Sequence, residues 1–477
     1  MEFKNVWKNY DKKQLKELEN LNREYIDFIS ECKTERECTD RIVAMAEEAG
    51  YRELETVIAS GKKLKAGDKV YAVWMNKSVC LFQLGKKPLT EGMNILGAHI
   101  DSPRIDVKSN PLYEKKDIAY LDTHYYGGIK KYQWVTLPLA LHGVLVKKDG
   151  TTVEINIGED ADDPVFFISD LLIHLAAEQL DKKAAKVIEG EALDVIIGSK
   201  PLSIMHETTE TKSKKKSDKE KAEDGVKAGI LDILKLEYGV EEDDFYSAEI
   251  EVVPAGRARE AGFDRSIVLG YGQDDRVCAF TSLKAMLDTK SVDRTMSCIL
   301  VDKEEIGSVG ATGMHSRFFE NAVAELLNLC GDYSDLNLRR TLARSAMLSS
   351  DVSAAYDPSF AGSFEEKNAA YLNGGMVFNK YTGARGKSGS NDANAEYIAH
   401  IRKVFDEAKV QFQFAELGKV DQGGGGTIAY ILAEHGMNVI DAGIPVLNMH
   451  APWEATGKAD IYETYRGYKA FVKGVTI

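Results

Sequence analysis

The sequence predicts an α/β fold with a second, β-rich domain inserted into it. Apolar runs of strand length alternate with amphipathic segments in the first hundred residues and again after residue 264. Between about residues 106 and 264 this alternation stops, and strand-like runs follow one another. The 477 residues also exceed what one ordinary core accommodates. For the α/β part we expect a mixed, largely parallel sheet flanked by helices on both faces.

The helices are predicted from apolar residues spaced three or four positions apart. In residues 12–30 the apolar residues recur at this spacing, and residues 37–48 continue the pattern. Three later segments have the same character and are expected to be helices: 275–288, 394–408 and 426–436.

The strands are predicted from short apolar runs bounded by turn residues. Residues 70–85 read as two strands around a turn at Asn76 and Lys77. Further strands are expected at 93–101, 297–302, 345–351 and 444–450.

The interruption defines the expected domains. We assign residues 1–105 and 265–477 to the α/β domain and residues 106–264 to the insert. Inside the insert, residues 167–184 are predicted to be helical. Residues 207–225 hold many lysines and almost no apolar residues, which predicts a mobile surface loop. The alternative, a basic docking patch, is weakened by the acidic residues between the lysines.

Composition excludes several classes of function. The net charge of −14 argues against a nucleic-acid partner, because phosphate binding needs a basic face. The longest apolar run, near 134–146, is too short to span a membrane, and the charged N-terminus lacks the apolar core of a signal peptide. The six cysteines are scattered without paired spacing. We therefore expect a cytoplasmic protein with reduced thiols.

Acidic and histidine residues follow the predicted strands. In open α/β sheets, ligands bind beyond the carboxyl ends of the strands. Each cluster alone has an ordinary explanation, since paired acids commonly cap a helix and a histidine at a strand end is usually structural. Together the clusters have the chemistry of a two-metal site, because imidazole and carboxylate are the ligands that zinc prefers. They are His99 with Asp101, Asp274 with Asp275, Glu304 with Glu305, Asp351, and His450.

The adjacent glutamates in VDKEEIGS raise a problem of charge. Two converging carboxylates repel each other unless cations lie nearby. A metal site removes this repulsion if one glutamate of the Glu304–Glu305 pair ligates a metal ion and the other carries protons for a metal-bound water. Asp101 is placed two residues after His99, where it can orient the imidazole ring.

These residues resemble a known family. The segments GAHIDSPRID, GQDDR, VDKEEIGS, SSD and NMHAPWE occur in the order found in the aspartyl aminopeptidase and aminopeptidase I family, metallopeptidase family 18. The resemblance covers nearly the whole chain. It implies a zinc-peptidase α/β domain, an inserted β-rich dimerisation domain, and dimers that build a tetrahedral dodecamer.

The resemblance also implies roles for the site residues. His99 and Asp351 look like ligands of the first metal ion, Glu305 and His450 like ligands of the second, and Asp274 like the bridging ligand. Glu304 resembles the general base and acid, and Asp101 the residue that orients His99. Asp275 stands where the family often has asparagine, so a structural role is expected.

The substrate preference is left open by departures from the family pattern. Members that prefer acidic residues usually have a WHTWFDRDL-like run, where this chain reads KYQWVTLPL at 131–139. N-terminal Asp or Glu and neutral or apolar residues are therefore alternatives. Candidate substrate contacts are Lys380, a glycine of the run before the 426–436 segment (Gly425), and His124, which could reach a neighbouring subunit's site.

The function expected from the sequence is that of a metal-dependent aminopeptidase acting on peptides with a free N-terminus. Two divalent ions per subunit are implied, with zinc suggested by the family and cobalt or manganese able to use the same ligands. A two-metal phosphoesterase is an alternative, although only Arg104 and Arg276 could supply the cations it needs. A non-catalytic metal-binding scaffold is the other alternative.

Overall fold

Two compact units make up the chain in the computed structural model, which describes residues 4–206 and 225–477. Unit 1 comprises Met1–Ser102, Arg257–Met449 and Trp453–Ile477. Unit 2 comprises Pro103–Gly256 and His450–Pro452. The lysine-rich segment predicted at 207–225 lies, apart from Gly225, outside the described residues.

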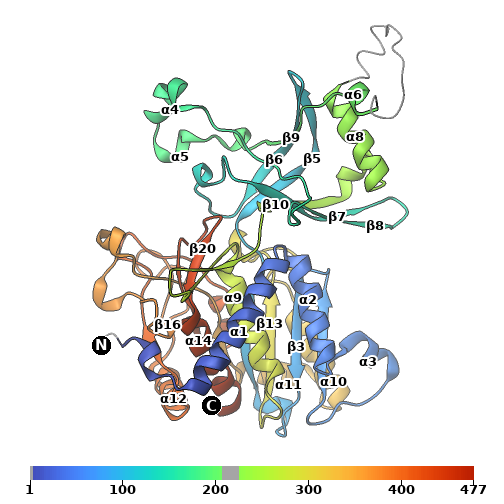
Figure 1. Cartoon of the computed structure of the whole chain (residues 1–477). Helices are drawn as coiled ribbons and strands as arrows, with labels where there is room; N and C mark the ends of the chain where they lie inside the picture. The colour runs from blue at the N-terminus through green and yellow to red at the C-terminus, as the bar shows by residue number, and fades with distance from the viewer. Residues whose placement is uncertain (1–3, 207–224) are drawn as a thin grey trace. The chain divides into compact units, whose positions relative to one another are not determined.

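Unit 1 is built on a nine-stranded sheet with the order β1-β2-β3-β13-β4-β14-β18-β16-β17 (Figure 1). Its central strands β13, β4, β14 and β18 are all parallel, whereas the sheet becomes antiparallel on either side of them. This is the mixed α/β arrangement that the sequence predicts. The strands are β1 (Arg52–Glu53), β2 (Lys69–Trp74), β3 (Ser78–Gln83), β4 (Met93–His99), β13 (Thr295–Val301), β14 (Ala346–Ser349), β16 (Met376–Asn379), β17 (Phe412–Phe414) and β18 (Asn438–Gly443).

Helices cover both faces of this sheet because its strands are apolar on both sides. Along β13, Cys298 and Leu300 belong to one buried cluster, and Ile299 and Val301 belong to the other. One cluster includes residues of α1 (Lys12–Glu31), α2 (Glu35–Glu48), α9 (Gln273–Leu287), α12 (Ala395–Glu407) and α14 (Lys458–Gly474). The other includes residues of α3 (Leu54–Ser60), α10 (Phe318–Cys330), α11 (Asp335–Ala343) and α13 (Ala429–Ala433).

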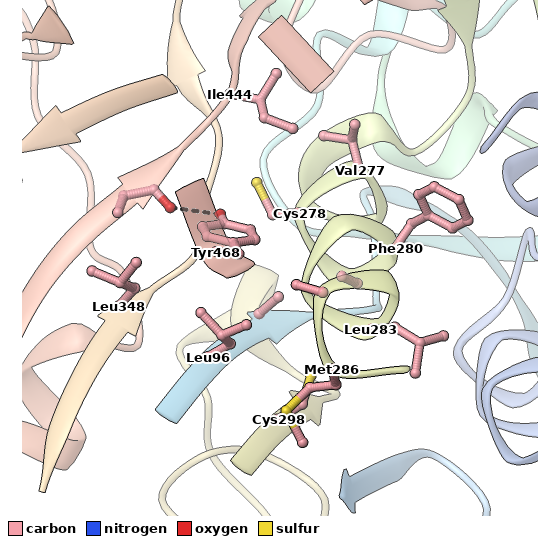
Figure 2. Packing of buried hydrophobic residues seen from close by; sticks show 14 of the residues in the cluster. Leu96, Val277, Cys278, Phe280, Leu283, Met286, Cys298, Leu348, Ile444 and Tyr468 are labelled. Carbon is pink, nitrogen blue, oxygen red and sulfur yellow. Dashed lines mark hydrogen bonds between the residues drawn. The ribbon is translucent and has the colours of Figure 1, made fainter. Parts of the chain in front are cut away.

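Helix α9 is buried along most of its length next to the site. Figure 2 shows Val277, Phe280 and Leu283 along it, with Leu96 of β4 nearby. Helix α14 packs against α9, and the hydroxyl of Tyr468 donates a hydrogen bond to the carbonyl of Ala442 at 2.7 Å. Helix α9 is therefore held by close packing against both β4 and α14.

A smaller five-stranded sheet, also in unit 1, has the order β11-β12-β20-β19-β15. The strand predicted at 444–450 belongs here, as the short β19, and not to the main sheet. The prediction also missed β18, and it made the helix at 426–436 too long, because the helical residues are only those of α13. The bounds are β11 (Arg259–Ala261), β12 (Ile267–Gly270), β15 (Ser353–Ala354), β19 (Pro445–Leu447) and β20 (Glu454–Gly457).

Unit 2 is built on a six-stranded antiparallel sheet with the order β8-β7-β10-β5-β6-β9. The helix predicted at 167–184 is wrong, since Phe167 bridges to Ile196 and only single turns follow. The strands are β5 (Arg104–Lys115), β6 (Ile118–Tyr126), β7 (Leu139–Val146), β8 (Thr152–Ile157), β9 (Val195–Gly198) and β10 (Ala248–Pro254). The helices are α4 (Ala177–Leu180), α5 (Ala184–Val187), α6 (Leu202–His206) and α8 (Val226–Glu237).

Within the described part of the chain, no helix has the length and apolar character needed to cross a membrane.

Candidate metal centre

Three neighbouring parallel strands bring three of the predicted clusters to one end of the main sheet: His99 with Asp101, Glu304 with Glu305, and Asp351. Strand β4 pairs with β13 on one side and with β14 on the other. Val301 lies opposite His99, and Ser349 lies opposite Gly97. The residues that follow these strands therefore emerge side by side, as carboxyl ends of parallel strands do.

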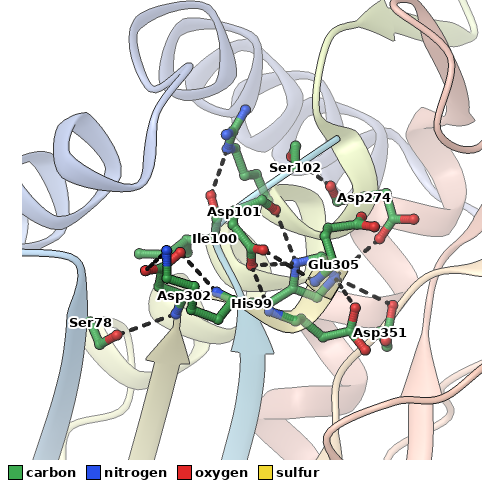
Figure 3. A network of polar contacts seen from close by, with 12 residues as sticks. Ser78, His99, Ile100, Asp101, Ser102, Asp274, Asp302, Glu305 and Asp351 are labelled. Atoms are coloured by element: carbon green, nitrogen blue, oxygen red, sulfur yellow. Dashed lines mark hydrogen bonds and ion pairs between the residues drawn. The ribbon is translucent and has the colours of Figure 1, made fainter. Parts of the chain in front are cut away.

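His99 lies at the centre of the cluster and is 2% exposed. Its Nε2 atom is 3.2 Å from Oδ1 of Asp274 and 3.9 Å from Oδ1 of Asp351. The same nitrogen is 3.9 Å from Oε2 of Glu304. Three carboxylates from separate segments thus converge on one imidazole nitrogen (Figure 3).

Asp101 contacts the other nitrogen of the same imidazole. His99 Nδ1 is 3.0 Å from the backbone oxygen of Asp101 and 3.3 Å from its Oδ1. The Asp101 carboxylate also accepts the backbone N–H groups of Glu304, at 3.1 Å, and Glu305, at 3.2 Å. The contacts at Nδ1 favour the tautomer of His99 that carries its proton on Nδ1. In that tautomer Nε2 is unprotonated and faces the carboxylates, which is the form of histidine that ligates a metal ion.

The backbone of Asp274 is held on both sides. Its N–H donates to Oε2 of Glu454 at 3.0 Å, and its carbonyl accepts from the Ser102 hydroxyl at 2.7 Å. Asp274 is in the first turn of α9 but has non-helical backbone angles, and the peptide bond between it and Asp275 is cis. These contacts fix the direction in which the Asp274 side chain leaves the backbone.

The loop after β13 carries the two adjacent glutamates. Lys303 has φ of 73°, in the left-handed region, and the short 3₁₀ turn Glu304–Ile306 follows it. This reversal, together with the contacts to Asp101, brings both glutamates back toward His99. Both side chains are half-buried.

Burial dominates the electrostatics of the centre. Burial raises the pKa of the Asp351 carboxyl well above its usual range, Asp275 raises it further, and His99 opposes this. Burial also raises the pKa of Asp275, against the effect of His99. For His99, burial lowers the pKa, but hydrogen bonds to Asp101 and Asp274 outweigh it and the pKa is raised. Each direction reflects negative charge gathered where water is scarce.

A divalent cation fits this set of side chains. His99, Asp274 and Asp351 each offer one ligand atom within 4.8 Å of the other two, and His99, Glu304 and Glu305 do the same. Imidazole and carboxylate are ligands that zinc takes, and its charge compensates the carboxylates that burial disfavours. Among the described residues, Asp275 belongs to no such group.

His450 belongs to unit 2, although the residues on either side of His450–Pro452 belong to unit 1. It follows β19 and comes directly after Met449, the last residue of a unit 1 segment. Its Nδ1 is 2.9 Å from the backbone oxygen of Gly128, and its φ is 64°. Its role as a metal ligand stays a prediction.

The predicted substrate contacts are found in three separate segments. Lys380 lies in unit 1, where its Nζ is 3.4 Å from Oδ1 of Asp392. Gly425 is half-buried beside Leu417. His124 is exposed in unit 2, with Nδ1 at 2.7 Å from the backbone oxygen of Tyr125. None of the three belongs to the groups of possible metal ligands found among the described residues.

Two residues that touch the centre were not singled out from the sequence. Glu454 and Ser102 anchor the backbone of Asp274. The only sequence signal was their position, since Glu454 ends the NMHAPWE segment and Ser102 follows Asp101. A contact from a side chain to a distant backbone leaves no periodic pattern in the sequence.

A mixed α/β sheet whose strand ends gather histidine, aspartate and glutamate defines a metal-dependent hydrolase. Residues 28–472 match the family described as Aminopeptidase I zinc metalloprotease (M18). The chain belongs to this family and is a zinc metalloaminopeptidase. The resemblance, the fold class, the zinc aminopeptidase function and the status as an enzyme predicted from the sequence are thereby confirmed, and the phosphoesterase and scaffold alternatives are set aside.

Similar proteins of known name and structure agree. The probable M18 family aminopeptidase 1 of Clostridium acetobutylicum is 60% identical over 471 residues, covering 99% of this chain and 98% of that protein. The crystal structure of an M18 family aminopeptidase from Thermotoga maritima has a TM-score of 0.91 and 44% identity, with 100% of both chains covered. That of aminopeptidase I from Clostridium acetobutylicum has a TM-score of 0.89 and 57% identity, with 99% of both covered.

Proposed function

We propose that the chain removes N-terminal residues from peptides with a free α-amine, using two divalent ions per subunit. His99 and Asp351 would hold the first ion, Glu305 and His450 would hold the second, and Asp274 would serve both as the bridging ligand. The observation that carries this proposal is the convergence on His99 Nε2 of Asp274, at 3.2 Å, and Asp351, at 3.9 Å. Zinc is the metal of the family, and cobalt or manganese could occupy the same ligands.

Bound divalent ions supply a Lewis acid for the scissile carbonyl and lower the pKa of a water molecule. The chain's own residues move the protons. Glu304, whose Oε2 is 3.9 Å from His99 Nε2, accepts the proton of the attacking water and then gives it to the leaving amine. Asp101 holds the His99 ring at Nδ1 and is a positioning residue.

The carboxylates around His99 attract a substrate that carries a positive charge. A protonated α-amine adds that charge, whereas a blocked N-terminus does not, which selects the end of the peptide. Lys380, Gly425 and His124 are the proposed substrate contacts. Asp392 pairs with both Lys380 (3.4 Å) and Lys387 (3.0 Å), so one carboxylate offsets only part of the positive charge of this loop, which also holds Arg385. An N-terminal Asp or Glu and a neutral or apolar residue stay alternatives.

We further propose a homo-oligomer of dimers, built as a tetrahedral dodecamer, in which unit 2 is the dimerisation domain. A solved structure with a TM-score of 0.72 and 20% identity is of the dodecamer of mApe1 from Saccharomyces cerevisiae, which shares the fold. In unit 2, apolar side chains at Leu172, Ile173 and Leu175 are 55%, 69% and 67% exposed. A run of exposed apolar residues of this kind typically marks a contact between proteins.

A cytoplasmic location is part of the same proposal. All six cysteines are free, and five of them are buried. Reduced thiols are the normal state of cysteine in the cytosol.

Hydrolysis of a panel of aminoacyl-p-nitroanilides tests the activity. The purified protein is stripped of metal, reloaded with zinc, cobalt or manganese, and compared on free and N-acetylated substrates. We expect metal-dependent release from the free substrates alone, with the preferred side chain settling the acidic or neutral choice. Release from the N-acetylated controls at the same rate, or none from any substrate with metal bound, would overturn the proposal.

A further inference from the structure

The loop that carries Glu304 and Glu305 is closed at its base by a buried hydrogen bond. Asp302 follows β13 directly and is fully buried. Its Oδ2 accepts the hydroxyl of Thr312 at 2.6 Å, and its Oδ1 accepts the backbone N–H of Lys303 at 2.8 Å. Asp302 and Thr312 thus join the two ends of a segment that contains both glutamates.

Ser78, at the start of β3, completes this contact. Its hydroxyl donates to the backbone carbonyl of Thr312 at 2.6 Å and accepts the backbone N–H of Asp302 at 3.2 Å. Figure 3 shows Ser78 and Asp302 joined beside His99 and Asp101. The three side chains, Ser78, Asp302 and Thr312, form a closed ring of hydrogen bonds and are here called the brace. All three are buried, so these bonds form away from bulk water, and the Lys303 ammonium, 3.6 Å from Oδ2 of Asp302, gives that oxygen another polar neighbour.

The loop above the brace is folded tightly on itself. The N–H of Ser308 donates to the carbonyl of Lys303 at 2.7 Å, and Ser308 has φ of 58°. A Cβ atom at Gly313 would lie 2.3 Å from the carbonyl oxygen of Ser308, so this close passage requires glycine. A loop with such internal constraints moves as one body if its base is released.

The glutamates are attached near one end of that body. The backbone N–H groups of Glu304 and Glu305 donate to Asp101 at 3.1 and 3.2 Å. These two contacts form a hinge beside His99, about which the loop can rotate. The brace attaches the loop at a second place. The contacts to Asp101 and the brace together fix how the loop is oriented.

We propose that the brace of Ser78, Asp302 and Thr312 is a positioning device for the aminopeptidase reaction, holding Glu304 at the distance from His99 at which it can transfer protons. This inference rests on the proposed role of Glu304. None of the three residues touches the reacting atoms. A displacement of about 1 Å at a catalytic group can lower a rate by about a hundredfold.

The test replaces the hydroxyl of Thr312. Thr312→Val keeps the shape and removes the hydrogen bond, whereas Thr312→Ser keeps the hydrogen bond. Thr341→Val is the matched control, because Thr341 is also buried and its hydroxyl donates to the Asn337 carbonyl at 2.8 Å, within α11. Ser78→Ala is the second variant if Thr312→Val does not fold.

Two readouts are taken on the full-length, zinc-loaded protein: kcat and KM on the best free substrate, and hydrogen exchange of the amides of residues 303–311. For Thr312→Val we expect kcat to fall by about tenfold to a hundredfold with KM within about twofold, and loop exchange to speed up at least about tenfold. Thr312→Ser should stay within about threefold of the wild type in both, and Thr341→Val should leave both unchanged.

The outcomes separate this inference from the proposed function. Unchanged loop exchange in Thr312→Val overturns the brace, and so does faster exchange with an unchanged kcat. Equal losses of kcat in Thr312→Val and Thr341→Val reduce the effect to stability and also overturn it. If the wild type hydrolyses no substrate, the proposed function fails, and hydrogen exchange alone then decides whether the brace holds the loop.

Discussion

The carboxylate of Asp101 accepts the backbone N–H of Glu304 at 3.1 Å while its Oδ1 lies 3.3 Å from His99 Nδ1. One side chain therefore connects the imidazole at the end of β4 with the glutamate loop after β13. Because both partners depend on the same carboxylate, the orientation of the His99 imidazole and the position of Glu304 are coupled.

Replacing Asp101 tests this coupling. Asp101→Asn leaves one acceptor oxygen where two N–H groups and an imidazole nitrogen now share a charged carboxylate. We expect zinc affinity to fall by about tenfold to a hundredfold, with a parallel loss of kcat. Competition with a chromophoric chelator measures the affinity. Asp68→Asn is the control, since Asp68 accepts the Lys65 N–H at 2.9 Å in a turn before β2, and unaltered zinc affinity in Asp101→Asn would contradict the prediction.

Glu304→Gln separates catalysis from metal binding. The amide has the size of the carboxylate but accepts no proton, so we expect kcat to fall by about a hundredfold to ten-thousandfold. Zinc content per chain, measured by mass spectrometry of the metal, should equal that of the wild type. Glu305→Gln is the comparison, and it should lose zinc. If Glu304→Gln keeps kcat within about twofold of the wild type, another residue carries the proton.

The buried carboxyl of Asp441 gives a pH dependence with a defined sign. Burial raises its pKa to about 6, although hydrogen bonds from Thr427 and Ser349 lower it. The folded protein therefore binds one more proton than the unfolded chain between about pH 4 and pH 6. The stabilisation that this proton provides is fully present below about pH 4, is lost as the pH rises through 6, and stays lost above it.

Asp441→Asn removes this titration and keeps an oxygen for the two hydroxyl groups. We expect the variant's free energy of unfolding, relative to the wild type, to increase by about 1–3 kcal/mol between pH 4 and pH 7. Urea unfolding at several pH values measures this difference. Asp264→Asn is the control, because Asp264 is exposed and its pKa is lowered by Ser266, so it should show no such increase. A constant difference for Asp441→Asn across the range would contradict the assignment.

The exposed apolar segment of unit 2 is testable through assembly. Replacing both Leu172 and Ile173 by aspartate places two charges in the proposed contact, and we expect a species of lower mass by sedimentation velocity. Leu236→Asp is the matched control, since Leu236 is 74% exposed in α8 of the same unit. If the double variant sediments as the wild type does, this segment is not the interface.

The sequence predicted which side chains gather around His99 better than it predicted which residues hold their backbones in place. The convergence of His99, Glu304 and Asp351 could be predicted because each follows a strand of the parallel part of the sheet. The carboxyl ends of neighbouring parallel strands lie at the same end of the sheet. The roles of Glu454 and Ser78 could not, because each depends on one contact to a backbone group far away in the sequence.

The errors in the fold have a related cause. Residues 438–443 form strand β18, but the prediction assigns no structure to this short run between the helix expected at 426–436 and the strand expected at 444–450. The run at 167–184 is apolar at helical spacing but remains largely exposed and forms only single turns. The spacing of apolar residues shows which face of a helix would be apolar. It does not show whether another part of the protein packs against that face.

The strand order β13-β4-β14 also determines how late in translation the centre of the main sheet can form. Strand β4 leaves the ribosome early, but both of its neighbours in the sheet are encoded about two hundred residues or more downstream. All of the intervening insert must be translated before β4 gains either partner. Until then the edges of β4 stay unpaired, and His99, the proposed zinc ligand, lacks the carboxylates that follow β13 and β14. Zinc loading is therefore expected to be a late, post-translational event.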